Sequence, residues 1–110
     1  MKADRPYLEH IVDSISAIES FVAGGREEFL EKRLIHDAVI RNFEIIGEAA
    51  NQLSPILRES ETVPWGRIIA FRNRLIHGYW SVDLILVWDV VVRDLPTLKR
   101  EVERLLRQGV

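Results

Sequence analysis

Cysteine is absent from this chain of 110 residues, and histidine occurs only three times. The lack of cysteine excludes a disulfide framework and every metal site built on thiolates. No apolar run approaches the roughly 20 residues that a membrane span requires, and the first residues have no apolar core like that of a signal peptide. We therefore expect a soluble, cytoplasmic protein with no membrane partner.

Sequence motifs of common enzyme classes are also missing. The chain has no glycine-rich phosphate loop, and Gly24-Gly25 matches no nucleotide fingerprint. No Glu-x-x-His pair occurs, which counts against the di-iron sites that helical bundles build from that motif. His36 beside Asp37 is too sparse to indicate a metal site. We expect no metal and no cofactor, and a metal-dependent enzyme ranks behind the functions considered below.

What the chain does contain is apolar residues at helical spacing. Residues 1–110 are predicted to form a single all-α domain, an antiparallel four-helix bundle with a kinked last helix. Residues 56–63 are expected to be an irregular connection, and Pro96 is expected to kink or interrupt the last helix. The expected helices run from Asp4 to Gly24, from Arg26 to Leu53, from Pro64 to Gly78, and from Ser81 or Asp83 to the end of the chain.

Two features indicate helix contacts beyond a simple bundle. Gly47 lies in the middle of the second expected helix, where glycine costs about 1 kcal/mol relative to alanine. This suggests the close approach of another helix, either in the same chain or in a second subunit. Residues 82–92 are apolar nearly all round, which is typical of a central helix or an oligomer seam. We expect a two-fold homodimer.

An arginine interrupts the apolar stripe of the third expected helix. Arg72 follows Ile68 by four residues and precedes Leu75 by three. Arginine keeps its charge, so a buried arginine needs an anionic partner. The carboxylates that share one side of the second helix are candidates, although they could equally form a solvated face: Asp37, Glu44 and Glu48. Gly78 is expected to end the third helix in the left-handed conformation.

Residues 62–82 contain no acidic residue, although the whole chain has a net charge of −2. Basic groups beside aromatic rings suit single-stranded RNA, which offers both phosphates and unstacked bases. Two of the aromatic residues, Trp65 and Phe71, are better explained as core residues. The basic residues within 62–82 are Arg67, Arg72, Arg74 and His77. Arg67 and Arg74 are additional RNA-binding candidates.

Arg72 and His77 could together support cleavage of RNA. Histidine titrates near neutral pH and can take or give a proton, and the arginine fork can bind two phosphate oxygens. Five residues of separation place the two side chains about 140° apart on an ideal helix. One histidine cannot easily act as both base and acid, but a two-fold dimer would supply two copies of His77. Alternatively, Arg72 only forms an ion pair and His77 only stabilises a helix end.

The segment from Arg72 to Tyr79 reads R-x-x-x-x-H-x-Y, the pattern of a known family. On this motif the sequence resembles the HEPN superfamily, specifically the HepT-like proteins once called domain of unknown function 86. Residues 41–50 are similar to that family's second helix, and Asp94-Leu95-Pro96 to its last-helix kink. The resemblance covers nearly the whole chain.

The resemblance implies a toxin of a type II or type VII-like toxin–antitoxin pair that acts as a metal-independent endoribonuclease. It implies that Arg72 and His77 are catalytic and that Asn73 is the supporting polar residue. It also implies that a nucleotidyltransferase antitoxin silences the toxin by attaching AMP to Tyr79, which could otherwise be a core-edge residue with a solvated hydroxyl. The alternative function is a non-catalytic module that binds a nucleotide or the transferase.

Overall fold

The computed structural model describes residues 3–60 and 62–109, and the regular structure in these two ranges is entirely helical. Turns at Gly24-Gly25 and at residues 62–64 separate its longer helices. The elements are α1 (Arg5–Phe21), α2 (Arg26–Glu31), α3 (Arg33–Asn51), α4 (Pro55–Ser60), α5 (Trp65–His77), the 3₁₀ turn η1 (Tyr79–Ser81), α6 (Leu84–Asp89), the π-helical turn η2 (Val90–Asp94) and α7 (Leu95–Arg107).

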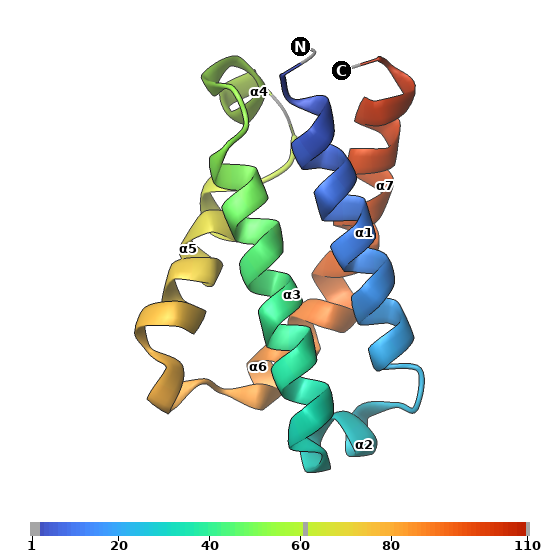
Figure 1. The fold of residues 1–110 in the computed structure, drawn as a ribbon, viewed down its shortest axis with the longest axis vertical. Helices are drawn as coiled ribbons and strands as arrows, with labels where there is room; N and C mark the ends of the chain where they lie inside the picture. Colours follow the sequence, from blue (N-terminus) through green and yellow to red (C-terminus); the bar gives the residue numbers. More distant parts are fainter. Residues whose placement is uncertain (1–2, 61, 110) are drawn as a thin grey trace.

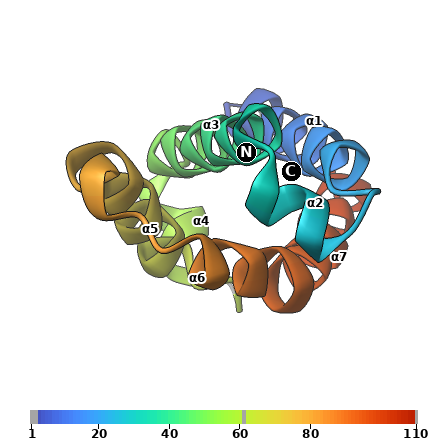
Figure 2. The same cartoon turned by 90° about the horizontal axis from the view of Figure 1, so that it is seen from below.

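The longer helices alternate in direction along the chain (Figure 1). Helix α3 packs against both α1 and α5, and α1 packs against α7. Seen from below, α2 lies across the lower end of the molecule (Figure 2). The apolar sides of these helices share one core, to which α1 contributes Leu8, Ile11, Ile15 and Ile18. No helix in the described ranges is both long and apolar enough to cross a membrane.

Helix α1 begins at the predicted place, with proline in its first turn. Asp4 does not cap its own helix with its side chain. It is buried, and its two carboxylate oxygens accept hydrogen bonds from the backbone N–H and the hydroxyl of Ser54, both at 2.7 Å. This contact joins the start of α1 to the connection between α3 and α4.

The prediction of one long helix from Arg26 to Leu53 is wrong. The chain leaves the helical conformation at Lys32, where φ is −97° and ψ is 107°, and α3 ends at Asn51. The break turns α2 so that Phe29 is fully buried, with its ring 5.3 Å from that of Trp88. Burial of this aromatic ring stabilises the turned arrangement. A local helical pattern cannot show it, because Trp88 is far away in the sequence.

Two further local predictions need correction. The connection expected at residues 56–63 contains the short helix α4. Helix α5 does stop before Gly78, but the glycine has φ −118° and ψ 34°, so it is not left-handed. A Cβ added there would lie 3.1 Å from the carbonyl oxygen of Arg74, which accepts the Gly78 N–H at 2.9 Å. The absence of a side chain permits this tight turn.

The last helical stretch begins after Asp83, one of the two predicted starts, and the Asp83 carboxylate accepts the N–H groups of Ile85 and Leu86. The backbone hydrogen-bond pattern changes from α-helical in α6 to π-helical in η2, just before Pro96. This change agrees with the predicted interruption. Of the two alternatives for residues 82–92, the central helix is wrong, and the oligomer seam stays a prediction. Only one side of α6 and η2 is buried, through Val87 and Val91, while apolar side chains on the other side are exposed: Ile85, Leu86 and Val92.

Candidate functional site

The side chain of Arg72 crosses from α5 to α3, and both its guanidinium and its aliphatic stem make close contacts. Guanidinium Nη2 donates to Glu48 Oε1 at 2.7 Å, and Nη1 donates to Asn73 Oδ1 at 2.8 Å. Near the backbone, its aliphatic stem lies over Gly47: a Cβ added to that glycine would lie 2.6 Å from Arg72 Cγ. The close approach predicted at Gly47 is therefore made by α5 of the same chain.

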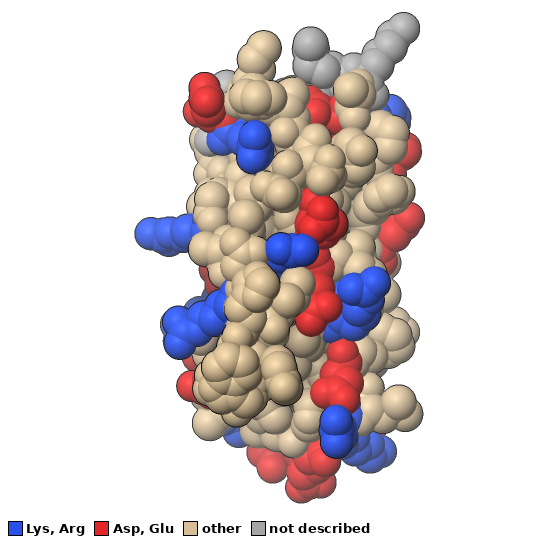
Figure 3. Space-filling model, turned by 60° about the vertical axis from the view of Figure 1, so that its left-hand side comes forward, with Lys and Arg blue, Asp and Glu red and all other residues tan. Residues whose placement is uncertain are grey.

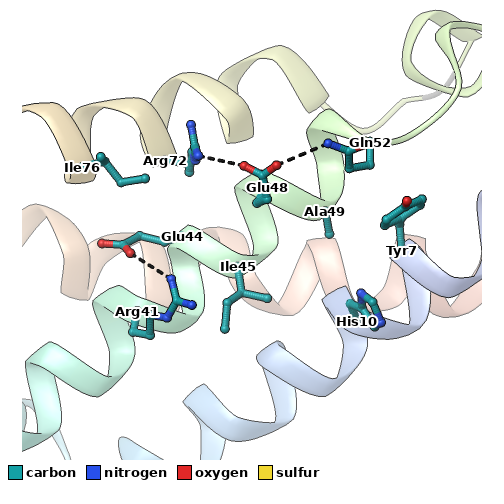
Figure 4. A pocket seen from close by; sticks show the side chains of 10 residues that line it. All are labelled: Tyr7, His10, Arg41, Glu44, Ile45, Glu48, Ala49, Gln52, Arg72 and Ile76. Atoms are coloured by element: carbon teal, nitrogen blue, oxygen red, sulfur yellow. Dashed lines mark hydrogen bonds and ion pairs between the residues drawn. The ribbon is translucent and has the colours of Figure 1, made fainter.

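Arg72 forms part of the wall of a surface pocket of about 280 Å³ (Figure 4). The pocket lies over the outer side of α3, with α1 along one edge and α5 along the other. Arg41 and Glu44 form an ion pair of 3.4 Å within it. The complete lining is Tyr7, His10, Arg41, Glu44, Ile45, Glu48, Ala49, Gln52, Arg72 and Ile76.

Of the three carboxylates predicted as partners for Arg72, Glu48 is the one that binds it. Glu44 pairs with Arg41, and Asp37 pairs with Arg33 at 3.1 Å. The Arg72 side chain is 26% exposed and that of Glu48 is 50% exposed, so the pair is at the surface rather than in the core. Arg72 therefore has a carboxylate partner, although its side chain is not buried as the prediction of that partner had assumed.

Sequence reasoning missed a second contact of this carboxylate. Gln52 Nε2 donates to Glu48 Oε2 at 3.3 Å, so Glu48 lies between the amide and the guanidinium (Figure 4). The signal was available, because Glu48 and Gln52 have the four-residue spacing that brings side chains together on one helix face. His10 is exposed at the edge of the same pocket.

The side chain of His77 is exposed in the last turn of α5, and this side chain makes no hydrogen bond or ion pair with any residue of the described ranges. It does not line the pocket that contains Arg72. The helix stays regular through His77, so the separation of about 140° around its axis is not reduced by unwinding within the motif. Within one chain, Arg72 and His77 face different surfaces.

Two exposed aromatic rings follow the motif helix. Tyr79 is 74% exposed and Trp80 is 75% exposed, and their rings pack edge to face with centroids 5.3 Å apart. Tyr79 is thus more exposed than a core-edge residue. Trp65 is buried and Phe71 is half-buried against Phe43, which confirms the assignment of those two rings to the core.

The two additional RNA-binding candidates lie apart from the Arg72 pocket. Arg67 lines a second cleft of about 480 Å³, on the side of α5 that faces α7. Arg74 is exposed in the last turn of α5. The face shown in Figure 3 carries acidic and basic side chains next to one another rather than a continuous basic field. Across the described ranges, no three histidine or acidic side chains gather in a way that could hold a metal ion.

Together, fold and site define a small all-helical protein with an arginine anchored on the helix that carries the R-x-x-x-x-H-x-Y motif. Residues 11–105 match the family described as ribonuclease HepT-like, and the chain belongs to that family. No solved structure gives a significant match.

Three named relatives are similar over nearly their whole length. A protein of Caldanaerobacter subterraneus subsp. tengcongensis named "Putative RNase" is 36% identical, covering 98% of both chains. A protein of Thermococcus cleftensis named "Probable ribonuclease HepT" is 37% identical, covering 94% of this chain and 96% of the relative. A "Putative RNase" of Methanocaldococcus jannaschii is 39% identical, covering 90% of this chain and 93% of the relative.

Proposed function

We propose that the protein is a metal-independent endoribonuclease in which Arg72 and His77 are the catalytic pair. Membership of the ribonuclease HepT-like family supports this activity. The observation that carries the assignment to these residues is the anchoring of the Arg72 guanidinium between Glu48 and Asn73. An arginine fixed in this way is preorganised to bind a phosphate, and an exposed histidine follows on the same helix.

The reaction requires three groups. A base removes the proton from a 2′-hydroxyl, whose oxygen attacks the neighbouring phosphorus. A cation stabilises the charge on the phosphorane, and an acid gives a proton to the departing 5′-oxygen. Arg72 serves as the cation. The two proton transfers fall to the His77 residues of two subunits, because one chain carries a single histidine in the motif.

This mechanism rests on a two-fold homodimer that brings both motifs to one cleft. Exposed apolar side chains after α5 and along α6 and η2 support an association of this kind, since a monomer gains nothing by leaving them in water. They are Tyr79, Trp80, Ile85, Leu86 and Val92.

The proposed physiological role is the toxin of a type II or type VII-like toxin–antitoxin pair. A cognate nucleotidyltransferase silences it by attaching AMP to Tyr79. The 74% exposure of Tyr79 supports its accessibility to such an enzyme. An AMP group two residues after His77 adds negative charge and bulk where RNA phosphates must approach.

The test is expression of wild type and His77→Ala in a bacterial host, scored by growth and by integrity of extracted RNA. Wild type should arrest growth and fragment RNA, and His77→Ala should do neither. His36→Ala is the matched control, because it removes a histidine that lies outside the pocket of Arg72, and this variant should remain toxic and cleave RNA. A toxic, cleaving His77→Ala variant would refute the catalytic assignment.

The second candidate function is a non-catalytic module that binds a nucleotide or the transferase. Within one chain, Arg72 and His77 face different surfaces, and this favours the second candidate function. It predicts a purified protein with unmodified Tyr79 that cleaves no RNA but binds a mononucleotide or the transferase. Mass spectrometry of Tyr79 separates this outcome from a silenced toxin.

A further inference from the structure

The carboxylate of Glu48 is placed between two donors that fix its orientation. One oxygen accepts from Arg72 at 2.7 Å and the other accepts from Gln52 at 3.3 Å (Figure 4). Neither Glu48 nor Gln52 belongs to the R-x-x-x-x-H-x-Y motif. The contacts form one continuous chain of side chains, which leads from Gln52 through Glu48 and Arg72 to Asn73.

The stem of Arg72 is restrained as well. Gly47 leaves room for its Cβ and Cγ, and the Nε atom is buried with no hydrogen-bond partner within the described ranges. A buried donor without a partner is unfavourable, so this position of the side chain has to be stabilised by other contacts. The charge-assisted hydrogen bond to Glu48 is the strongest contact available at the other end of the side chain.

The contacts of the guanidinium leave room for a ligand. Each Nη atom of arginine carries two hydrogens, and the contacts with Glu48 and Asn73 use one hydrogen on each. One hydrogen remains on each Nη atom, so each of these atoms can still donate to a phosphate oxygen. Glu48 can therefore hold the guanidinium while it binds a phosphate.

We propose that Glu48, supported by Gln52, is a positioning residue that orients Arg72 for the phosphate of the substrate. This inference rests on the proposed ribonuclease activity. A purely stabilising role explains the pair less well. The two side chains are 26% and 50% exposed, and pairs this exposed contribute only about 0–1 kcal/mol to stability.

The kinetic effect is expected on kcat rather than on KM. A loss of folded protein would also lower the apparent kcat, so the side-chain NMR signals of Arg72 are needed to separate the two. Removal of the Glu48 charge leaves the positive charge of Arg72 without its negative neighbour, so affinity for the RNA phosphate should stay equal or increase. The released guanidinium is misplaced in the transition state, and displacements of about 1 Å can lower a rate by about a hundredfold. Glu48→Ala should therefore lower kcat by about tenfold or more without raising KM.

The experiment compares Glu48→Ala and Glu48→Gln with Asp37→Asn, in both RNA cleavage and side-chain NMR of the Arg72 guanidinium. Asp37→Asn is the matched control, because it breaks the Arg33–Asp37 ion pair on the same helix α3 but outside the pocket of Arg72. We expect Glu48→Gln, which keeps an acceptor oxygen, to retain more activity than Glu48→Ala. We expect the Arg72 signals to show faster guanidinium rotation in Glu48→Ala only.

The two readouts separate the possible failures. Unchanged Arg72 signals in Glu48→Ala, or unchanged kcat with wild-type cleavage intact, would overturn the positioning role and leave the ribonuclease proposal standing. If wild type cleaves no RNA but the Arg72 signals still depend on Glu48, the ribonuclease proposal fails and the positioning of Arg72 by Glu48 is supported.

Discussion

Replacement of Gly47 by alanine should disturb both stability and the position of Arg72. The added Cβ would be 2.6 Å from Arg72 Cγ, still closer to Arg72 Cβ, and 3.4 Å from the backbone oxygen of Ile68. Ordinary carbon contacts lie at about 3.5–4.0 Å. The crowded atoms are at the base of the Arg72 side chain, so a change of its outer torsions cannot relieve the overlap. Helix α5 has to move away from α3 by about 1.5 Å to restore that spacing at Arg72 Cβ.

Two energies of opposite sign decide the net effect on stability. Alanine in the middle of a helix gains about 1 kcal/mol over glycine. Overpacking of a tight contact costs about 1–3 kcal/mol. We expect Gly47→Ala to lower the free energy of unfolding by about 1–2 kcal/mol, since the overlap involves a helix rather than the end of a flexible side chain. RNA cleavage should fall by about a hundredfold, because Arg72 moves with α5.

The assay is urea unfolding followed by tryptophan fluorescence, to which the buried Trp65 contributes, together with RNA cleavage in the absence of denaturant. Gly66→Ala is the matched control, because it lies in α5 with no atom within 4 Å of an added Cβ. That variant should be as stable as wild type or more stable by up to about 1 kcal/mol, with unchanged activity. A Gly47→Ala protein that is both more stable and fully active would refute the reasoning.

Two further predictions concern stability. Asp4→Ala should lower the free energy of unfolding by about 2–3 kcal/mol in urea titrations, since it removes both acceptors of Ser54 in a buried position, whereas Ser54→Ala should lose only about 1 kcal/mol. Hydrogen bonds donated by Arg104 and Thr62 lower the pKa of Glu101. A group with a lowered folded-state pKa adds stability above its unfolded pKa and loses it as pH falls through the folded pKa. The stability difference between wild type and Glu101→Gln should therefore be greatest near neutral pH and disappear in acid. A difference that persists in acid would contradict this role.

Local sequence signals predicted much of the helical structure correctly. Proline in the first turn of α1, the start of α5 after Pro64 and the Asp83 cap each depend on neighbours within a few residues. Residues of one helix face are similarly related by short spacing. The apolar stripes therefore predicted an all-helical chain, and the arginine within one stripe predicted an anionic partner for Arg72.

Local patterns failed where distant residues compete. The helical period continues across Lys32, but burial of Phe29 against Trp88 favours a break there. Gly78 has the residue type of a left-handed helix end, although its φ is −118°. A sequence shows which conformations are allowed at such positions, and contacts from other elements select among them.

The sequence by itself determined the helical character of the chain, the R-x-x-x-x-H-x-Y motif and the set of carboxylates that could pair with Arg72, because each follows from residue type and short spacing. Only the tertiary structure decided that Glu48 rather than Asp37 or Glu44 is that carboxylate. Three acidic residues on one side of α3 are equivalent in a periodic pattern. The choice follows from the packing of α5 over Gly47, which places Arg72 beside the next residue of α3.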